Sequence, residues 1–307
     1  MIKVGIIGGA GYTAGELIRL LINHPEVEIK FINSSSNAGN KITDVHEGLY
    51  GETDLVFTDE LPLDEIDVLF FCTAHGDTKK FMESHNVPED LKIIDLSMDY
   101  RIKSDDHDFI YGLPELNRRT ICHSKHVANP GCFATCIQLG LLPLAKNLLL
   151  NDDVMVNAIT GSTGAGVKPG ATSHFSWRNN NMSVYKPFNH QHVPEIKQSL
   201  KQLQNSFNSE IDFIPYRLIR FTRSRPMPSS SSMATSLATR AFSSSSEKLE
   251  KGRRDQPPGR PAARSQTFMQ AIMLPLLMPA KITWTACRCS LVARATSEAL
   301  TAFQILI

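Results

Sequence analysis

The chain has 307 residues, a hydrophobic fraction of 42%, a charged fraction of 21% and a formal net charge of +1. This length allows two domains with separate cores, and the composition is typical of a soluble globular protein. The near-neutral charge gives no indication of nucleic-acid or membrane binding, and no apolar run approaches the roughly 20 residues that span a bilayer. The six irregularly spaced cysteines do not suggest a disulfide framework. We therefore expect a cytoplasmic protein with free thiols and no signal peptide.

The first two thirds of the chain alternate predicted strands and helices. A buried strand over 2–8 leads through a glycine-rich turn into an amphipathic helix that stops near Pro25. Further strands are expected over 27–36, 66–74, 91–100 and 154–164, with one helix after residue 74 and a long one after Cys132. Strands alternating with helices predict an α/β fold built on a Rossmann-type, doubly wound parallel sheet.

The glycine-rich turn holds Gly8, Gly9, Gly11 and Gly15. Their spacing is not a regular GxGxxG, so an ordinary strand-to-helix turn is the alternative interpretation. However, the turn joins a buried strand to a helix, which is where a dinucleotide pyrophosphate binds. The second strand ends in serines, with no acidic residue at its end to hold a ribose hydroxyl. Together with the nearby Lys41, these hydroxyls would tolerate a 2′-phosphate, so NADP is expected in place of NAD.

Cys132 follows Pro130 and Gly131 and precedes the long helix. The positive end of the helix dipole lowers the pKa of a thiol at this place, and the resulting thiolate is a competent nucleophile. On its own, a cysteine here is better explained as a small buried hydrophobe. Cys136, one helical turn further on, and Cys72, inside an apolar strand, are both expected to serve packing.

A short segment with two histidines offers a general acid–base. His190 and His192 lie two residues apart, with Glu195 close behind. A histidine oriented by a carboxylate is the usual partner of a reactive thiol. Two other interpretations remain open, a surface loop and a zinc site, although no third ligand has a convincing spacing.

Seven stretches together resemble N-acetyl-gamma-glutamyl-phosphate reductases, the NADPH-dependent enzymes of arginine biosynthesis that are related to aspartate-semialdehyde dehydrogenases. The most diagnostic are "YGLPELNR" (111–118) and "ANPGCFAT" (128–135). The other matching stretches are 4–17, 34–46, 95–102, 161–170 and 190–196. The resemblance implies a Rossmann domain over 1–130 that binds NADP. It also implies an α+β catalytic domain over 131–217, where the resemblance ends. It also implies reduction of N-acetyl-gamma-glutamyl phosphate to the 5-semialdehyde and phosphate through a cysteine thioester.

The resemblance also implies roles for individual residues. Cys132 would be the nucleophile and His190 or His192 the acid–base, with His192 favoured because Glu195 is available to orient it. The residues expected to bind the cofactor are Gly8, Gly11, Tyr12, Thr13, Gly15, Ser34, Ser35, Ser36, His75, Gly164 and Gly166. Asn129, Ser162 and Arg101 are expected to bind the substrate, with a surface salt bridge as an equal alternative for Arg101. No metal is expected, and the partners are a small acyl phosphate and further copies of the chain.

The resemblance ends near residue 217. Residues 1–217 hold 19 Lys and Arg against 27 Asp and Glu, whereas residues 218–307 hold 13 against 4, with two runs of four serines. We interpret 218–307 as out-of-frame sequence, with a divergent basic tail as the milder alternative. A catalytic domain without its later strands would fold poorly and show little activity. The rival functions are an aspartate-semialdehyde dehydrogenase, a non-catalytic nucleotide-binding remnant and a metalloprotein.

Overall fold

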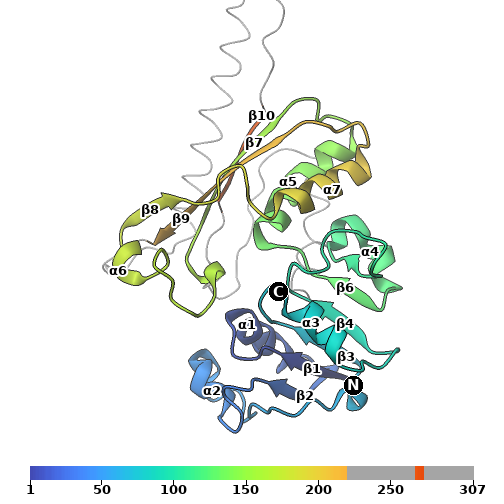
Figure 1. Ribbon diagram of the computed structural model, residues 1–307, viewed down its shortest axis with the longest axis vertical. Helices are drawn as coiled ribbons and strands as arrows, with labels where there is room; N and C mark the ends of the chain where they lie inside the picture. Colours follow the sequence, from blue (N-terminus) through green and yellow to red (C-terminus); the bar gives the residue numbers. More distant parts are fainter. Residues whose placement is uncertain (220–266, 273–307) are drawn as a thin grey trace, which may run out of the picture.

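The computed structural model describes residues 1–219 and 267–272. The hypothesis of an out-of-frame tail concerns residues that lie almost entirely outside this part of the chain. Two sheets, each with its own helices, lie one above the other in Figure 1. The first is a six-stranded sheet in the order β2-β1-β3-β4-β6-β5, and the second has four strands in the order β10-β7-β9-β8.

The first sheet is parallel throughout. Its strands are β1 (Ile2–Ile7), β2 (Val27–Asn33), β3 (Val68–Phe71), β4 (Lys92–Asp95), β5 (Ile110–Tyr111) and β6 (His126–Ala128). β1 is apolar and buried from Val4 to Ile7 because both of its faces are covered there. Val4 and Ile6 pack into a cluster with α1 (Tyr12–Leu21), whereas Ile7 faces a cluster that reaches α3 (Asp77–Ser84). The expected doubly wound fold is confirmed, and its strands are shorter than predicted.

The strand order of this sheet indicates where a cofactor would bind. From β1 the chain goes to β2 on one side and then returns to β3 on the other, so the strand order reverses at β1. Ligands of doubly wound sheets bind outside the carboxyl ends of the strands at this reversal. The glycine-rich turn after β1 and the loop of His75 after β3 both lie at that edge.

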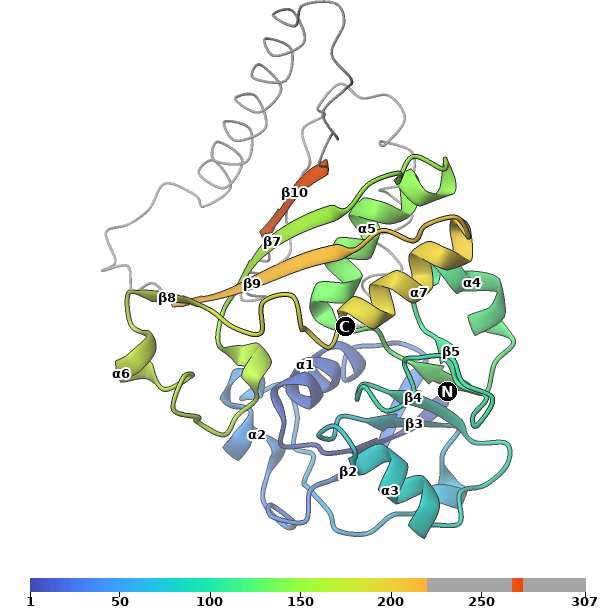
Figure 2. The ribbon, with the colours of Figure 1, turned by 45° about the horizontal axis from the view of Figure 1, so that its top comes forward.

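The second sheet carries the helix that begins at Cys132. Its strands are β7 (Val154–Thr160), β8 (Asn181–Val184), β9 (Ile211–Ile219) and β10 (Thr267–Ile272), of which only β8 is antiparallel to its neighbour. α5 (Cys132–Lys146) and α7 (Val193–Leu203) pack on this sheet through a cluster that includes Phe133, Ile196 and Phe213 (Figure 2). Two short helices, α2 (Ile42–Val45) and α6 (Phe175–Arg178), and α4 (Pro114–Cys122) complete the named helices.

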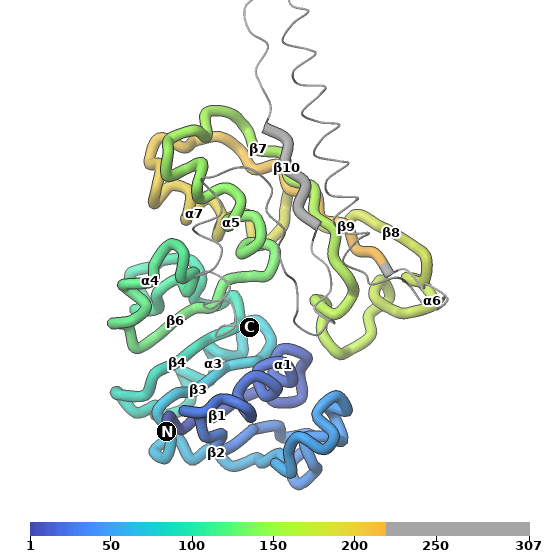
Figure 3. The backbone as a smooth tube through the Cα atoms, turned by 180° about the vertical axis from the view of Figure 1, so that it is seen from behind, coloured from blue at the N-terminus to red at the C-terminus, as the bar shows by residue number. Residues whose placement is uncertain are grey.

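The long loop after β7 reaches back to the first domain. In the front, tilted and rear views, the segment between β7 and α6 hangs beside α1 and α2 (Figures 1–3). This segment holds Ser162, Gly164 and Gly166, and the positive φ of 86° at Gly166 favours glycine. The loop is therefore placed near the crevice that the first sheet forms.

None of the helices in the described part of the chain is long and apolar enough to cross a membrane. The cysteines there, Cys72, Cys122, Cys132 and Cys136, are free thiols. Cys72 is buried, and burial raises its pKa to about 12, which confirms a packing role. Cys136 packs against the hydrophobic cluster of the second domain, as expected.

Candidate active site

Cys132 is the first residue of α5, and Gly131 caps that helix in an extended conformation. The N–H groups of Cys132 and Phe133 lie close enough to the sulfur to lower its pKa, and the charge of Arg101 acts in the same direction. The residue has exposed area, yet enough protein surrounds the sulfur that desolvation outweighs these effects. The net result is a raised pKa, so the expectation of a lowered one is wrong. Burial is the physical reason, because it penalises the charged thiolate.

His192 lies across the start of the same helix. Its Nδ1 accepts a hydrogen bond from the backbone N–H of Ala134 at 3.3 Å. A Cβ placed on Gly131 would lie 2.3 Å from Nε2 of His192, so the ring rests directly on the glycine that precedes Cys132. Because Nδ1 accepts, the neutral ring carries its proton on Nε2, and that edge faces the peptide before the thiol.

His190 lies behind His192, with 4.6 Å between the ring centroids. Its Nδ1 accepts from the N–H of His192 at 3.2 Å, and its ring contacts Phe133 and Phe213 edge to face. Burial lowers the pKa of His190 to about 4 and that of His192 to about 3, with His190 and Arg101 adding to the effect on His192. Both imidazoles are therefore neutral hydrogen-bond donors at pH 7.

Glu195 does not orient His192, so that expectation is wrong. Both of its carboxylate oxygens have other partners: Oε1 accepts from Arg101 at 3.1 Å, and Oε2 accepts from the N–H of Gly131 and the hydroxyl of Tyr111, each at 3.0 Å. The carboxylate thus fixes the peptide that leads into Cys132. His192 is oriented by the backbone of Ala134 instead.

Arg101 is buried and pairs with Glu195, so the alternative of a surface salt bridge is wrong. Its Nε donates to the carbonyl of Asn129 at 2.8 Å, and its Nη2 donates to the carbonyl of Leu96 at 2.8 Å. Asn129 is held in turn, since its N–H donates to the carbonyl of Asp95 at 2.7 Å. A direct contact of Arg101 or Asn129 with substrate stays a prediction, and their observed contacts stabilise the approach to Cys132.

Two polar residues of this centre were assigned no role from the sequence. Tyr111 and Gln138 form a buried chain in which Gln138 Nε2 donates to the Tyr111 hydroxyl at 2.7 Å, and that hydroxyl donates to Glu195. Burial and the charge of Glu195 raise the pKa of Tyr111 far above its usual value. Tyr111 opens the diagnostic stretch 111–118, but nothing in its spacing shows that it meets a residue 84 positions away.

His75 connects the cofactor crevice with this centre. Its Nδ1 accepts from the N–H of Met98 at 3.1 Å, and its charge contributes to the lowered pKa of His192. The adjoining Gly76 has a positive φ of 89° and donates its N–H to Asp99. The loop after β3 therefore lies at the carboxyl edge of the first sheet, close enough to His192 to act on it electrostatically.

The glycine-rich turn has the shape that a dinucleotide needs. Gly8 has a φ of +81°, and a Cβ there would lie 2.7 Å from the carbonyl oxygen of Cys72. At Gly11 a Cβ would lie 3.5 Å or more from every neighbour, so no protein contact requires a glycine there. The room beside Gly11 suits close approach of a phosphate to the start of α1, where Tyr12 and Thr13 follow. The residues present thus fit a dinucleotide.

The serines after β2 also fit the predicted 2′-phosphate end. Ser34 is buried, whereas Ser35 and Ser36 are exposed. Asn37 donates to the hydroxyls of Ser34 and Ser36 at 3.1 and 3.0 Å, which gathers these groups at one place. In the loop after β7, Ser162 has a buried hydroxyl without a partner among the described residues.

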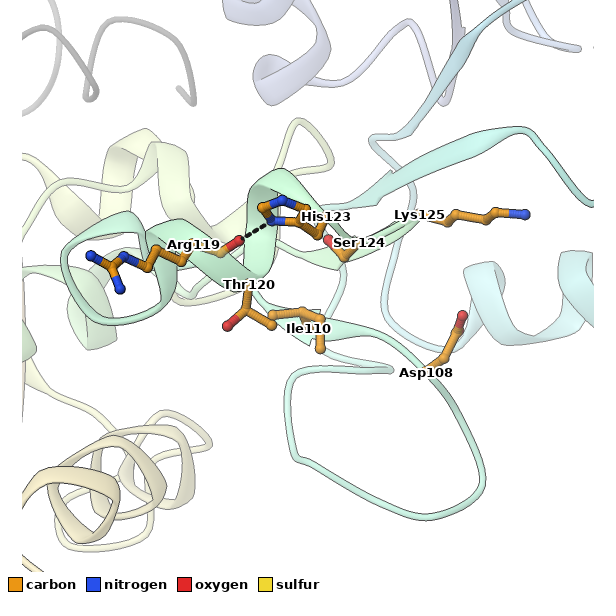
Figure 4. Close-up of a pocket in the computed structure, with 7 residues that line it drawn as sticks. All are labelled: Asp108, Ile110, Arg119, Thr120, His123, Ser124 and Lys125. Carbon is orange, nitrogen blue, oxygen red and sulfur yellow. Dashed lines mark hydrogen bonds between the residues drawn. The ribbon is translucent and has the colours of Figure 1, made fainter.

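A hollow on the first domain lies apart from this centre and is shown in Figure 4. It is lined by Asp108, Ile110, Arg119, Thr120, His123, Ser124 and Lys125. Arg119 and Lys125 extend away from each other, and Lys125 donates to Asp90. The charges do not converge on a common ligand, so this hollow is not the active site. Within the described residues, no group of three or more His, Cys, Asp or Glu side chains is placed to hold a metal.

Comparison with known proteins agrees with this geometry. Residues 3–124 match the domain family "Semialdehyde dehydrogenase, NAD binding domain", and residues 132–243 match "Semialdehyde dehydrogenase, dimerisation domain". The N-acetyl-gamma-glutamyl-phosphate reductase of Phocaeicola vulgatus is 95% identical over 217 residues, which are 71% of this chain and 67% of that protein. The chain belongs to the N-acetyl-gamma-glutamyl-phosphate reductase family. The protein of the same name from Bacteroides thetaiotaomicron is 90% identical over the same share of each chain.

Solved structures show the same fold at lower identity. The aspartate semialdehyde dehydrogenase of Candida albicans, determined with NADP, has a TM-score of 0.52 and 18% identity, and the match covers 75% of this chain and 74% of that one. The family and the Rossmann-type fold predicted from the sequence are therefore confirmed. The match also shows that the dinucleotide domain and the cysteine-bearing domain are combined as in semialdehyde dehydrogenases.

Proposed function

We propose that this chain carries the site of an NADPH-dependent reductase of N-acetyl-gamma-glutamyl phosphate, in which Cys132 is the nucleophile. The family membership and the arrangement of Cys132, His192 and Gly131 at the start of α5 support this proposal. The site residues, the domain limits of 1–130 and 131–217 and the assembly into homo-oligomers belong to the same proposal. The family match described as a dimerisation domain supports the last of these. A cytoplasmic location stays a prediction.

In the first step, the sulfur of Cys132 attacks the acyl carbon, the bond from that carbon to the phosphate oxygen breaks, and phosphate leaves. The product is a thioester on Cys132, and the proton of the thiol leaves with phosphate. Burial raises the pKa of the resting thiol, whereas the N–H groups of Cys132 and Phe133 and the charge of Arg101 act in the opposite direction. The N–H groups at the start of α5 then face the oxygen on which negative charge develops.

The role of the cofactor is to supply a hydride to the thioester carbon. His192 lies against Gly131, the residue before the thiol, and we assign to its Nε2 proton a hydrogen bond to the oxygen that becomes negatively charged. The carbon–sulfur bond then breaks, the semialdehyde leaves, and Cys132 is released as a thiolate that takes up a proton. Glu195 and Arg101 hold the peptide of Gly131 still throughout, and we assign them positioning roles.

The observation that carries the proposal is the position of Cys132 as the first residue of α5, directly after the glycine on which the ring of His192 rests. The test is acyl-phosphate-dependent oxidation of NADPH by a version of the chain that carries the C-terminal part of its relatives, and by Cys132→Ser in the same version. Replacement of the sulfur should reduce turnover by a factor of about 10³ or more, since covalent catalysis is lost. An unchanged rate would refute the role of Cys132. Running N-acetyl-gamma-glutamyl phosphate beside aspartyl phosphate separates this function from that of an aspartate-semialdehyde dehydrogenase.

The proposal also concerns the origin of the segment 218–307. The curated relatives match 217 residues of this chain at 95% and 90% identity, and this length ends where the charge balance changes. This supports the hypothesis that the remainder is read out of frame, although the dimerisation-domain match reaches residue 243. We expect weak activity from the chain as it stands. Resequencing the gene across codons 210–225 tests the hypothesis, and an intact frame that encodes the serine runs would refute it.

A further inference from the structure

His46 lies outside the catalytic centre and contacts the glycine-rich turn. It follows α2, and its Nε2 lies 2.7 Å from the carbonyl oxygen of Gly9, which is 37 positions away in the sequence. A carbonyl oxygen only accepts, so Nε2 carries a proton and donates it to this bond. His46 is the last residue of the stretch 34–46 that resembles the family, and the resemblance implies no role for it.

The same imidazole rests on α1. A Cβ placed on Gly15 would lie 2.6 Å from Nδ1 and 2.9 Å from Cε1 of His46. No other amino acid fits at position 15 unless the ring moves. In dinucleotide-binding turns, the third glycine permits close packing of the helix. Here the group that packs against it is the ring of His46.

The bond to Gly9 also determines the direction of the next peptide N–H. In a trans peptide, the carbonyl and the following N–H point in opposite directions. With the carbonyl of Gly9 held towards His46, the N–H of Ala10 points to the opposite side of the turn. The N–H of Gly9 is occupied by the carbonyl of Asn33 at 2.9 Å, whereas that of Ala10 has no acceptor among the described residues. The N–H of Gly11 donates to the carbonyl of Gly8 at 3.2 Å, and the open N–H groups of the first turn of α1 come after it.

We propose that His46 is a positioning residue for a dinucleotide pyrophosphate: its bond to the Gly9 carbonyl presents the Ala10 N–H, together with the start of α1, to a phosphate oxygen. The inference rests on the dinucleotide binding in the proposed function. The segment 33–46 leaves β2 at the predicted 2′-phosphate end and returns to the turn at His46. The ring of His46 therefore contacts the pyrophosphate end of the predicted site, and its observed contacts with Gly9 and Gly15 lie apart from the serines of the 2′-phosphate end.

The experiment compares His46→Leu, which removes the donor, with His46→Gln, whose amide retains one. His123→Leu is a matched control, because His123 also donates to a carbonyl, that of Arg119 at 2.8 Å, but lies in the separate hollow of Figure 4. NADPH dissociation constants of the full chain are measured by fluorescence titration, with the unfolding midpoint of each variant. His46→Leu should raise the constant about tenfold, His46→Gln should recover most of the loss, and His123→Leu should leave it unchanged.

A second ligand separates positioning from a general structural role. Adenosine 2′-monophosphate carries the 2′-phosphate but no pyrophosphate, so its binding should be the same in the parent and in His46→Leu. Equal weakening of both ligands would overturn the proposal, as would an NADPH constant within twofold of the parent value in His46→Leu. A parent chain that does not bind NADPH would overturn it as well. Because no acyl phosphate is used, absence of reductase turnover does not affect the result.

Discussion

The two domains of this chain build their functional groups in different ways. In the first domain the glycine-rich turn is one continuous stretch, residues 8 to 11, between β1 and α1, and Gly15 follows within that helix. In the second, the surroundings of Cys132 come from distant parts of the chain, and Glu195 alone joins Arg101, Tyr111 and Gly131. The first kind of site is a short stretch of backbone whose glycines pack closely against Asn33, His46 and Cys72, whereas the second depends on a buried ion pair and its hydrogen bonds.

This difference determines where each site is vulnerable. The turn depends on the space around single glycines, so one added methyl group changes it locally. The catalytic centre depends on a carboxylate whose side chain is only 2% exposed and on an arginine that is 6% exposed. Loss of one partner leaves the other as an uncompensated buried charge, which is far more costly than loss of an exposed pair. The largest losses of stability are therefore expected from substitutions at the catalytic centre around Glu195.

The largest expected effect follows from Glu195→Ala. This change leaves the Arg101 guanidinium buried without its carboxylate and frees the N–H of Gly131 and the hydroxyl of Tyr111. The free energy of unfolding should fall by about 3–5 kcal/mol, measured by urea titration. Glu210→Ala is the control, because the Glu210 pair with Lys197 is exposed and should contribute less than about 1 kcal/mol. Equal losses in the two variants would refute the structural role of Glu195.

The sequence predicted the two kinds of site to different extents. The glycine-rich turn, the absence of an acid after β2 and the start of α5 at Cys132 are local features, and the structure places them as expected. The partner of Glu195 was predicted wrongly, because proximity along the chain favoured His192, three residues away. On α7 those two side chains diverge: His192 turns to the start of α5, and Glu195 to Arg101. Tertiary packing of residues 94 positions apart is not visible in spacing alone.

The second effect concerns Gly131→Ala. The added methyl group would lie 2.3 Å from Nε2 of His192, so the ring must leave its place above the helix start. A displacement of about 1 Å in a catalytic group costs on the order of a hundredfold in rate. The variant should therefore lose about that factor in kcat while its NADPH dissociation constant stays unchanged, since the turn of the first domain is untouched. A kcat within threefold of the parent value would contradict the position assigned to His192.

The third effect is a loss of folding stability at acid pH, which arises from the buried histidines beside Cys132. Burial lowers the pKa of His190 to about 4 and of His192 to about 3, below the ordinary value of 6.5. Between those values the unfolded chain binds more protons than the folded one, so stability is present at neutral pH and falls as the pH drops below about 6.5. At pH 5 each ring should account for about 2 kcal/mol. Urea titrations of the parent and of His192→Asn at pH 7 and pH 5 measure this, and an equal pH dependence in both would exclude His192 as the cause.

The smallest effect on stability is expected in the glycine-rich turn of the first domain. At Gly11 an added methyl group meets the carbonyls of Gly8 and Cys72 at 3.5 and 3.7 Å, which are ordinary contacts, and the backbone φ of −79° suits any residue. Gly11→Ala should therefore keep the unfolding free energy within about 0.5 kcal/mol of the parent value. The methyl group occupies the room left for a phosphate, so the NADPH dissociation constant should rise about tenfold.

Gly8→Ala is the contrasting variant, since its φ of +81° and the 2.7 Å approach of its Cβ to the carbonyl oxygen of Cys72 predict a loss of stability. If Gly11→Ala bound NADPH as tightly as the parent, the free space beside Gly11 would have no part in dinucleotide binding.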